Sequence, residues 1–349
     1  MATSSQKKIE SEIFKIIRYY HFFAYAPSFE LIHTFFPDKI SKKKLRDNLK
    51  QLVSKHKLLS HLNNQTYIIP DRPENTFAFC PLTFNLPLYT LPQYSIFIQK
   101  QMNKYQITNN KLKLIQPYLR IISSFPFIRM IGITGSASMG NCGKNDDTDL
   151  CIITKSRSLW FSRFICVALA KIMGLYGEHV CLNLFFDESD LTVPIQKQTI
   201  YIGHELLQMK PIVNKYKTYE RMLINNEWVF SLFPNAKKNT SSLRTKRCNL
   251  DETVNNDKKI VILACLAGRQ VSPDGAHPKS DSGVASLPRM TFDYYNSLLS
   301  PFEALFKFIQ LLIIHKNKTA LIITPTQLWL FKKDFEVKLS PKKNYKKIT

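Results

Sequence analysis

The alternation of apolar and polar positions divides the chain into helical and extended segments. Near the N-terminus, apolar residues recur at helical spacing in three short segments, 9–20, 29–35 and 42–56. Ser41 is a favourable N-cap for the third segment, because a serine hydroxyl accepts hydrogen bonds from the amides of a first helical turn. Two extended runs around an Asn63-Asn64 turn, residues 58–62 and 67–69, then predict a hairpin.

Three short helices followed by a hairpin resemble a winged helix, and residues 1–70 are expected to form a winged-helix-like domain. Its third helix carries the basic residues Lys42, Lys43, Lys44 and Arg46. Basic side chains on such a helix can bind the phosphates of DNA or RNA. The alternative is a solvated basic face on a small packing domain, and no base-reading pattern of Asn or Gln decides between the two.

The middle of the chain predicts a sheet surrounded by helices. Residues 71–110 are expected to form a linker and a helix, and a helix over 111–124, with a kink at Pro117, leads into the sheet. Three apolar runs predict strands at 130–134, 150–153 and 180–186. Residues 156–175 predict a helix that is apolar on most sides and therefore buried against the sheet. The expected fold class is α+β, with a mixed-sheet core over 111–234.

The candidate chemistry lies between the first two strands, in the stretch IGITGSASMGNCGKNDDTDLCIIT over 131–154. The first strand stops at Gly135-Ser136, a turn whose backbone N–H groups could hold phosphates. Asp147 and Asp149 come at the start of the second strand, and side chains two residues apart on a strand share a face. Two neighbouring carboxylates repel each other unless a cation lies between them. Mg²⁺ suits carboxylate oxygens and also takes phosphate oxygens.

This Gly-Ser turn followed by D-x-D between two apolar strands resembles the nucleotidyltransferases of the DNA polymerase β-like superfamily, in particular the minimal nucleotidyltransferases. The resemblance covers about 112–233. It implies Mg²⁺-dependent transfer of a nucleoside monophosphate from an NTP to a hydroxyl group, with Asp147 and Asp149 holding the metal and Gly135 and Ser136 holding phosphates. The acceptor stays open among a protein side chain, a small molecule and an RNA end. The alternative is a surface hairpin whose turn is acidic.

The resemblance also implies a third carboxylate on the strand at 180–186, where this sequence has Asn183. Asp187 follows four residues later with matching parity, so it is a candidate catalytic residue. Three interpretations remain open: Asp187 substitutes, the site is weaker, or the protein binds a nucleotide without turnover, since Asn takes no proton at neutral pH. Arg157 and Arg163 are candidates for stabilising charge. The pair His204-Glu205 could face the site, but such a pair is more often structural.

Composition adds a preference for anionic partners. The formal net charge is +23, which favours nucleic acid, nucleotide or a membrane surface. The seven cysteines show no C-x-x-C pair and lie mostly in apolar runs, as is typical of reduced core residues in a cytosolic protein, and a zinc site is not expected. The N-terminus has no apolar signal region, and no apolar run is long enough to span a bilayer. We therefore expect a soluble, cytoplasmic protein.

The last part of the chain changes character. Residues 235–290 are basic at first and then rich in Gly, Ser and Pro, which predicts a flexible segment, and 291–349 predict a helical segment with a basic tail. A second function also fits the pattern: a DNA-binding regulator with a winged helix and a degenerate nucleotide-binding core. The basic third helix, the high charge and Asn183 favour it, and both functions could coexist in one chain.

Overall fold

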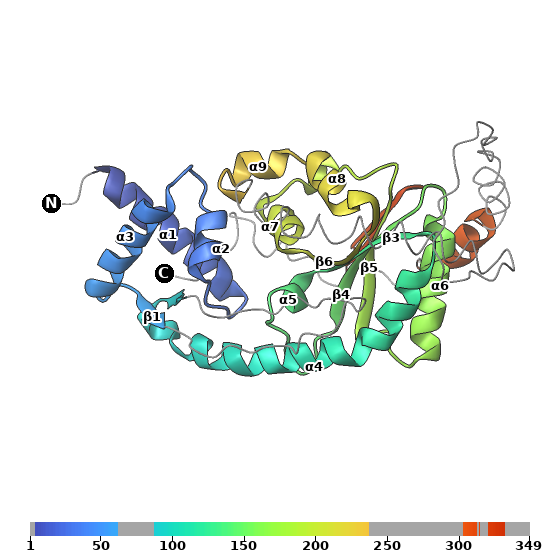
Figure 1. Cartoon of the computed structure of the whole chain (residues 1–349), viewed down its shortest axis with the longest axis horizontal. Helices are drawn as coiled ribbons and strands as arrows, with labels where there is room; N and C mark the ends of the chain where they lie inside the picture. The colour runs from blue at the N-terminus through green and yellow to red at the C-terminus, as the bar shows by residue number, and fades with distance from the viewer. Residues whose placement is uncertain (1–3, 62–86, 237–302, 313, 315–319, 332–349) are drawn as a thin grey trace, which may run out of the picture.

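The structure is a computed structural model that describes residues 4–61, 87–236, 303–312, 314 and 320–331. Figure 1 shows three N-terminal helices at one end of the molecule and a sheet at the other, with the long helix α4 running beside both. Within the described residues, no helix has the length and apolar character needed to cross a membrane.

The three predicted N-terminal helices are present. They are α1 (Ser4–Phe22), α2 (Phe29–Thr34) and α3 (Lys42–Ser54). The Ser41 hydroxyl accepts a hydrogen bond from the Lys44 N–H at 3.2 Å, which confirms the predicted N-cap. Buried apolar residues from all three helices, with Ile13, Ile32 and Leu45 fully enclosed, form one core. Sequence periodicity was sufficient here because each helix buries a single apolar stripe.

The predicted hairpin is not what the structure shows. Strand β1 (Leu59–His61) pairs antiparallel with β2 (Leu88–Thr90), a segment far along the chain. The predicted second hairpin strand, 67–69, lies outside the described residues. The described part therefore contains the three helices of the predicted winged-helix-like domain but does not establish its wing.

Helix α4 (Ile96–Ser124) is one continuous helix where the sequence predicted two, one within 71–110 and one over 111–124. It follows a short 3-10 turn, η1 (Pro92–Tyr94), and contains Pro117 in its interior. Proline removes one backbone hydrogen bond from a helix. Ile115, before Pro117, and Tyr118 and Leu119, directly after it, are fully buried, so packing against the sheet offsets the missing bond.

The core sheet is mixed and has the strand order β6-β3-β4-β5-β8-β7. Its strands are β3 (Ile128–Ile133), β4 (Thr148–Thr154), β5 (Val180–Asp187), β6 (Lys210–Asn214), β7 (Ala320–Ile323) and β8 (Gln327–Phe331). Strands β4 and β5 are parallel, and the other neighbours are antiparallel. Helix α6 (Leu159–Ile172) makes the crossover that a parallel pair requires. The predicted α+β class with a mixed sheet is observed, and strands β3 to β5 lie where the apolar runs placed them.

Three strands of this sheet were not predicted. Strand β6 is not among the three apolar runs that predicted strands, and β7 and β8 come from the region expected to be helix and tail. Each is short, and β6 contains Pro211 and is half-buried at the sheet edge. Strands this short carry weak periodicity, whether at the sheet edge as β6 and β7 or inside it as β8, so only their pairing partners define them.

Helices cover both faces of the sheet. On one face, Met130, Cys151 and Phe186 share a core with the N-terminal helices and with α7 (Ile200–Gln208), α8 (Thr218–Ile224) and α9 (Trp228–Leu232). On the other face, Ile131, Ile152 and Phe185 pack with α4 and α6. The 3-10 turns η2 (Ile195–Lys197) and η3 (Lys215–Lys217) precede α7 and α8. We call these the α7 face and the α6 face.

A change of register interrupts the alternation of side chains in β5. Asp149 of β4 pairs with Cys181, whereas Cys151 pairs with Leu184. A step of two residues on β4 thus corresponds to a step of three on β5, as in a β-bulge. After the bulge, Leu184 and Phe186 belong to the α7 face and Phe185 to the α6 face. Parity counted along the sequence is therefore not conserved across this strand.

His204 of α7 joins the N-terminal helices to the core. Its ring is stacked between Tyr19 of α1, with centroids 4.1 Å apart, and Phe35, with centroids 3.8 Å apart. Phe233 approaches it edge-on, and only 4% of the residue is exposed. Burial lowers the pKa of His204 well below its ordinary value, so the ring is neutral near pH 7. His204 is a packing residue, as the structural interpretation of the His-Glu pair implied.

Candidate functional site

The Gly-Ser turn (Gly135 and Ser136) directly follows the end of β3. It forms the start of the short helical turn α5 (Gly135–Ser138), and Gly135 has a φ of +60°. The Thr134 N–H donates to the Asp149 carbonyl at 3.0 Å, which fixes the turn against β4. A Cβ atom on Gly135 would lie 2.5 Å from Asp149 Oδ2. Both the positive φ and this close approach require glycine at position 135.

The carboxylate pair (Asp147 and Asp149) lies beside this turn. Asp147 immediately precedes β4 and Asp149 is its second residue, and both are half-buried. One carboxylate oxygen of each, together with the Sγ of Cys181, lie within 4.8 Å of one another. The structure thus brings together the two predicted metal-binding acids and places them next to the Gly-Ser turn. Three donor atoms at this separation can hold one divalent cation.

Asn183 also faces the carboxylate pair. Its Nδ2 donates to Asp149 Oδ1 at 2.8 Å, and only 7% of the residue is exposed. Its Oδ1 is buried and has no hydrogen-bond partner among the described residues. A buried amide oxygen without a partner is costly, and such oxygens are suitable cation ligands. The donor set therefore fits a divalent cation.

The structure does not bring Asp187 to the carboxylate pair, contrary to its predicted position. Asp187 pairs with Thr154 at the far end of β5, about 20 Å along the strand from Cys181. Its carboxylate accepts hydrogen bonds from the Arg157 N–H at 2.7 Å and from the Ser189 N–H and hydroxyl. The β5 bulge also turns it to the α6 face. The parity argument that related it to Asn183 fails for this reason.

Glu205 approaches the Gly-Ser turn from α7. Its Oε2 accepts a hydrogen bond from the Gly135 N–H at 3.0 Å. Burial raises the pKa of Glu205 above its ordinary value, and the hydrogen bond from Gly135 opposes this shift. A backbone N–H expected to hold phosphate is therefore occupied by a carboxylate. The Ser136 hydroxyl lies 3.5 Å from Cys142 Sγ and is half-buried.

Neither candidate arginine lies beside the carboxylate pair. Arg157 is exposed and sits next to Asp187, to which its backbone N–H donates. Arg163 is buried within α6, on the opposite face of the sheet, where its guanidinium donates to Gln310 Oε1. Burial lowers the pKa of Arg163. The structure gives Arg163 a packing role.

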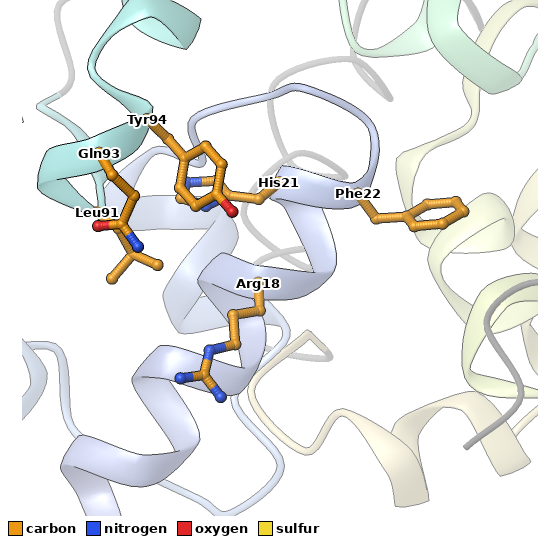
Figure 2. A pocket seen from close by; sticks show the side chains of 6 residues that line it. All are labelled: Arg18, His21, Phe22, Leu91, Gln93 and Tyr94. Carbon is orange, nitrogen blue, oxygen red and sulfur yellow. The ribbon is translucent and has the colours of Figure 1, made fainter. Parts of the chain in front are cut away.

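A separate small pocket lies between α1 and the segment before α4. Figure 2 shows it lined by Arg18, His21, Phe22, Leu91, Gln93 and Tyr94, with the Phe22 ring pointing away from the others. His21 Nε2 lies 3.0 Å from the Thr90 hydroxyl, and burial lowers the pKa of His21 to about 4. The pocket has no carboxylate lining, so its chemistry differs from that of the carboxylate pair.

Sequence reasoning missed one residue of the site, Cys181, and one contact of the site, the hydrogen bond between Gly135 and Glu205. Cys181 was assigned to the core with the other cysteines, although it stands two residues before Asn183 and shares its parity ahead of the bulge. Glu205 was recognised as a candidate, but its contact with Gly135 depends on how α7 packs. The parity that relates Cys181 to Asn183 could be found in the sequence. The contact of Glu205 with Gly135 depends on tertiary packing and could not.

Comparisons with known proteins give limited likenesses. No protein-family model and no curated protein matches the chain. Among solved structures, the chain is similar to a mutant of the toxin-antitoxin MntA-HpeT, at 13% identity over 42% of this chain and 97% of that chain, with a TM-score of 0.21. It is also similar to a toxin-antitoxin structure with AMP-PNP, at 15% identity over the same shares and the same TM-score.

Proposed function

We propose that the protein is a nucleotidyltransferase that moves a nucleoside monophosphate from an NTP to a hydroxyl of an acceptor. The observation that carries this proposal is the carboxylate pair, whose oxygens lie within 4.8 Å of each other beside a glycine-dependent turn. This arrangement combines a cation site with backbone donors for phosphate, as phosphoryl-group transfer requires.

In this proposal Asp147 and Asp149 hold a divalent cation, for which Mg²⁺ is the expected ion. Such a cation would neutralise negative charge on the triphosphate and orient it. The Gly135 N–H and the Ser136 hydroxyl bind phosphate oxygens after the carboxylate of Glu205 gives up its bond to Gly135. Since both groups are anionic, phosphate and Glu205 compete for the same donor.

Asn183 limits which groups of the site can accept a proton. Its amide stands beside Asp149, where a third carboxylate would act as general base, and an amide takes no proton at neutral pH. The proton of the acceptor hydroxyl must then pass to one of the two aspartates or to solvent. We therefore expect slow turnover that increases with pH as the acceptor hydroxyl ionises more readily.

The test is transfer of label from α-labelled NTPs to acceptors in a cell extract supplied with the purified protein and Mg²⁺. Asp147→Asn and Asp149→Asn should each lower incorporation at least about 100-fold, because each removes a negatively charged cation ligand. Asp146→Asn is the matched control: Asp146 is exposed, and an Asn can still accept the hydrogen bond from the Gly143 N–H. Full incorporation by Asp149→Asn would refute the proposal.

A second candidate function is binding to DNA or RNA through α3. Lys42, Lys43, Lys44 and Arg46 are all exposed on this helix. Lys42 pairs with Glu30 at 2.7 Å and Arg46 lies 4.9 Å over the Phe29 ring, so Lys43 and Lys44 are the stronger candidates for phosphate contacts. This proposal gains support from the exposure of the basic face and from the net charge of +23.

Nucleic-acid binding is tested by fluorescence anisotropy with duplex DNA and with RNA at several salt concentrations. If Lys43 and Lys44 contact phosphates, Lys43→Gln with Lys44→Gln should weaken binding and reduce the salt slope by roughly one to two. Lys171→Gln, on the exposed side of α6, is the control. An unchanged slope in the double variant would exclude α3 as the contact surface.

A further inference from the structure

The partner of Asp149 across the parallel strand pair is a cysteine. Asp149 and Cys181 are directly paired in the register of β4 and β5, and both are half-buried. The Cys181 Sγ lies within 4.8 Å of a carboxylate oxygen of Asp147 and of Asp149. Of the four cysteines in the described ranges, Cys142, Cys151 and Cys166 are buried, and Cys181 is the one that reaches the surface.

Asn183 gives an independent indication that this position receives a ligand. It follows Cys181 by two residues, ahead of the bulge, and its amide is turned to Asp149. Its Oδ1 is buried and finds no hydrogen-bond partner in the described part of the chain. Rotation of the amide would direct this oxygen to the carboxylate pair, an arrangement that is favourable when a cation lies between the oxygens.

We infer that Cys181 is a ligand of the cation held by the carboxylate pair, with the Asn183 amide oxygen beside it. This inference rests on the proposed function, which supplies the cation site. It adds a statement about which cations the site prefers. Cation binding converts the Cys181 thiol to a thiolate, which forms the metal–sulfur bond, and the proton leaves to solvent. No oxidation state changes in this step.

The donor set predicts which cations bind. Two carboxylates alone suit Mg²⁺, whereas a thiolate adds affinity for softer ions such as Zn²⁺ and the probe ion Cd²⁺. We therefore expect the protein to bind Cd²⁺ and Zn²⁺ more tightly than Mg²⁺. Cys181→Asp would give an all-oxygen donor set and narrow this preference, because it removes the sulfur ligand that favours the softer ions.

The first test is a titration of the full chain with Cd²⁺. Calorimetry measures the affinity, and ultraviolet absorption reports the cadmium–thiolate bond. Cys181→Ser should lose that absorption and weaken Cd²⁺ binding about 10- to 100-fold. Cys181→Asp should lose the absorption and gain affinity for Mg²⁺. Cys166→Ala is the control, since it removes a buried thiol on the α6 face. Cys181→Ser with unchanged Cd²⁺ absorption and affinity would overturn the inference.

A second measurement needs no variant. Alkylation of Cys181 in the wild-type chain, quantified by peptide mass spectrometry, should be suppressed by Zn²⁺ or Cd²⁺ and much less by Mg²⁺. Equal alkylation with and without Zn²⁺ would contradict the inference. The two proposals fail separately: protection of Cys181 without any nucleotide incorporation refutes only the transferase function. Incorporation that requires Asp149 but ignores Cys181 refutes only the thiol ligand.

Discussion

The Gly135 N–H donates a hydrogen bond of 3.0 Å to Glu205 Oε2, so a carboxylate from α7 occupies the turn expected to receive phosphate. The contact joins two segments that lie far apart in the sequence and meet on the α7 face of the sheet. A carboxylate and a phosphate are both anionic acceptors. Nucleotide binding at this turn must therefore exchange one acceptor for the other.

Glu205→Gln should bind NTP more tightly than the wild type. The amide oxygen can still accept the Gly135 hydrogen bond, but the negative charge that opposes a triphosphate is removed. We expect the NTP dissociation constant to fall roughly 3- to 30-fold, measured by calorimetry at constant ionic strength. Glu227→Gln, before α9, is the charge-matched control. Weaker NTP binding by Glu205→Gln would show instead that this carboxylate assists the nucleotide.

Glu205 also predicts a pH dependence of stability. Its pKa is raised in the folded chain, so the folded state holds this proton more tightly than the unfolded state. The corresponding stability is present below the unfolded pKa and is lost as pH rises through the folded pKa. Glu205→Gln should therefore gain stability relative to the wild type as pH rises above about 4, the ordinary range of a glutamate, measured by urea unfolding. A difference that stays constant as pH rises would contradict the prediction.

Gly135→Ala should disrupt the site beyond the cost of its backbone conformation. A non-glycine residue at φ +60° costs about 1–2 kcal/mol, and the added Cβ would also press on Asp149 Oδ2 at 2.5 Å. Gly174→Ala is a matched control, because Gly174 has a φ of +67° and open space around its Cβ position. We expect both variants to lose stability by thermal unfolding and only Gly135→Ala to lose cation binding.

His204→Ala should destabilise the chain by about 2–4 kcal/mol, because it leaves a cavity between Tyr19 and Phe35. The lowered pKa of His204 adds a pH effect of the opposite sign to that of Glu205. The stability is complete above the unfolded pKa of about 6.5 and is lost as pH falls below it. His204→Phe should reduce this loss of stability at low pH, measured by urea unfolding. His61→Gln, on the exposed β1, should not reduce it.

Asp187→Asn distinguishes a structural carboxylate from a catalytic one. The Asp187 carboxylate accepts a hydrogen bond from the Arg157 N–H, and Arg157 has a φ of +58°. Weakening that bond and the bonds from Ser189 should cost about 1–3 kcal/mol of stability. Nucleotide incorporation per folded molecule should be unchanged, measured beside Asp149→Asn. A loss of incorporation comparable to that of Asp149→Asn would return Asp187 to the catalytic residues.

The sequence by itself determined the parts of this protein that depend on local periodicity and short spacing. It placed α1 to α3, the Ser41 cap, strands β3 to β5 and helix α6, since each buries a continuous apolar stripe or run. It also predicted that Asp147 and Asp149 lie together near Gly135, because side chains two residues apart on a strand share a face and the Gly-Ser turn ends the preceding strand.

Only the tertiary structure decided the rest. The bulge in β5 begins after the Asp149–Cys181 pair, where three residues of β5 match two of β4, and it turns Asp187 to the α6 face. The edge strands β6 and β7 and the inner strand β8 are defined by their partners, and α4 stays continuous through Pro117 because its neighbours pack on the sheet. Glu205 reaches Gly135 because α7 folds over the α7 face. Such contacts join distant segments, so their physical cause lies in packing and pairing, which no local pattern encodes.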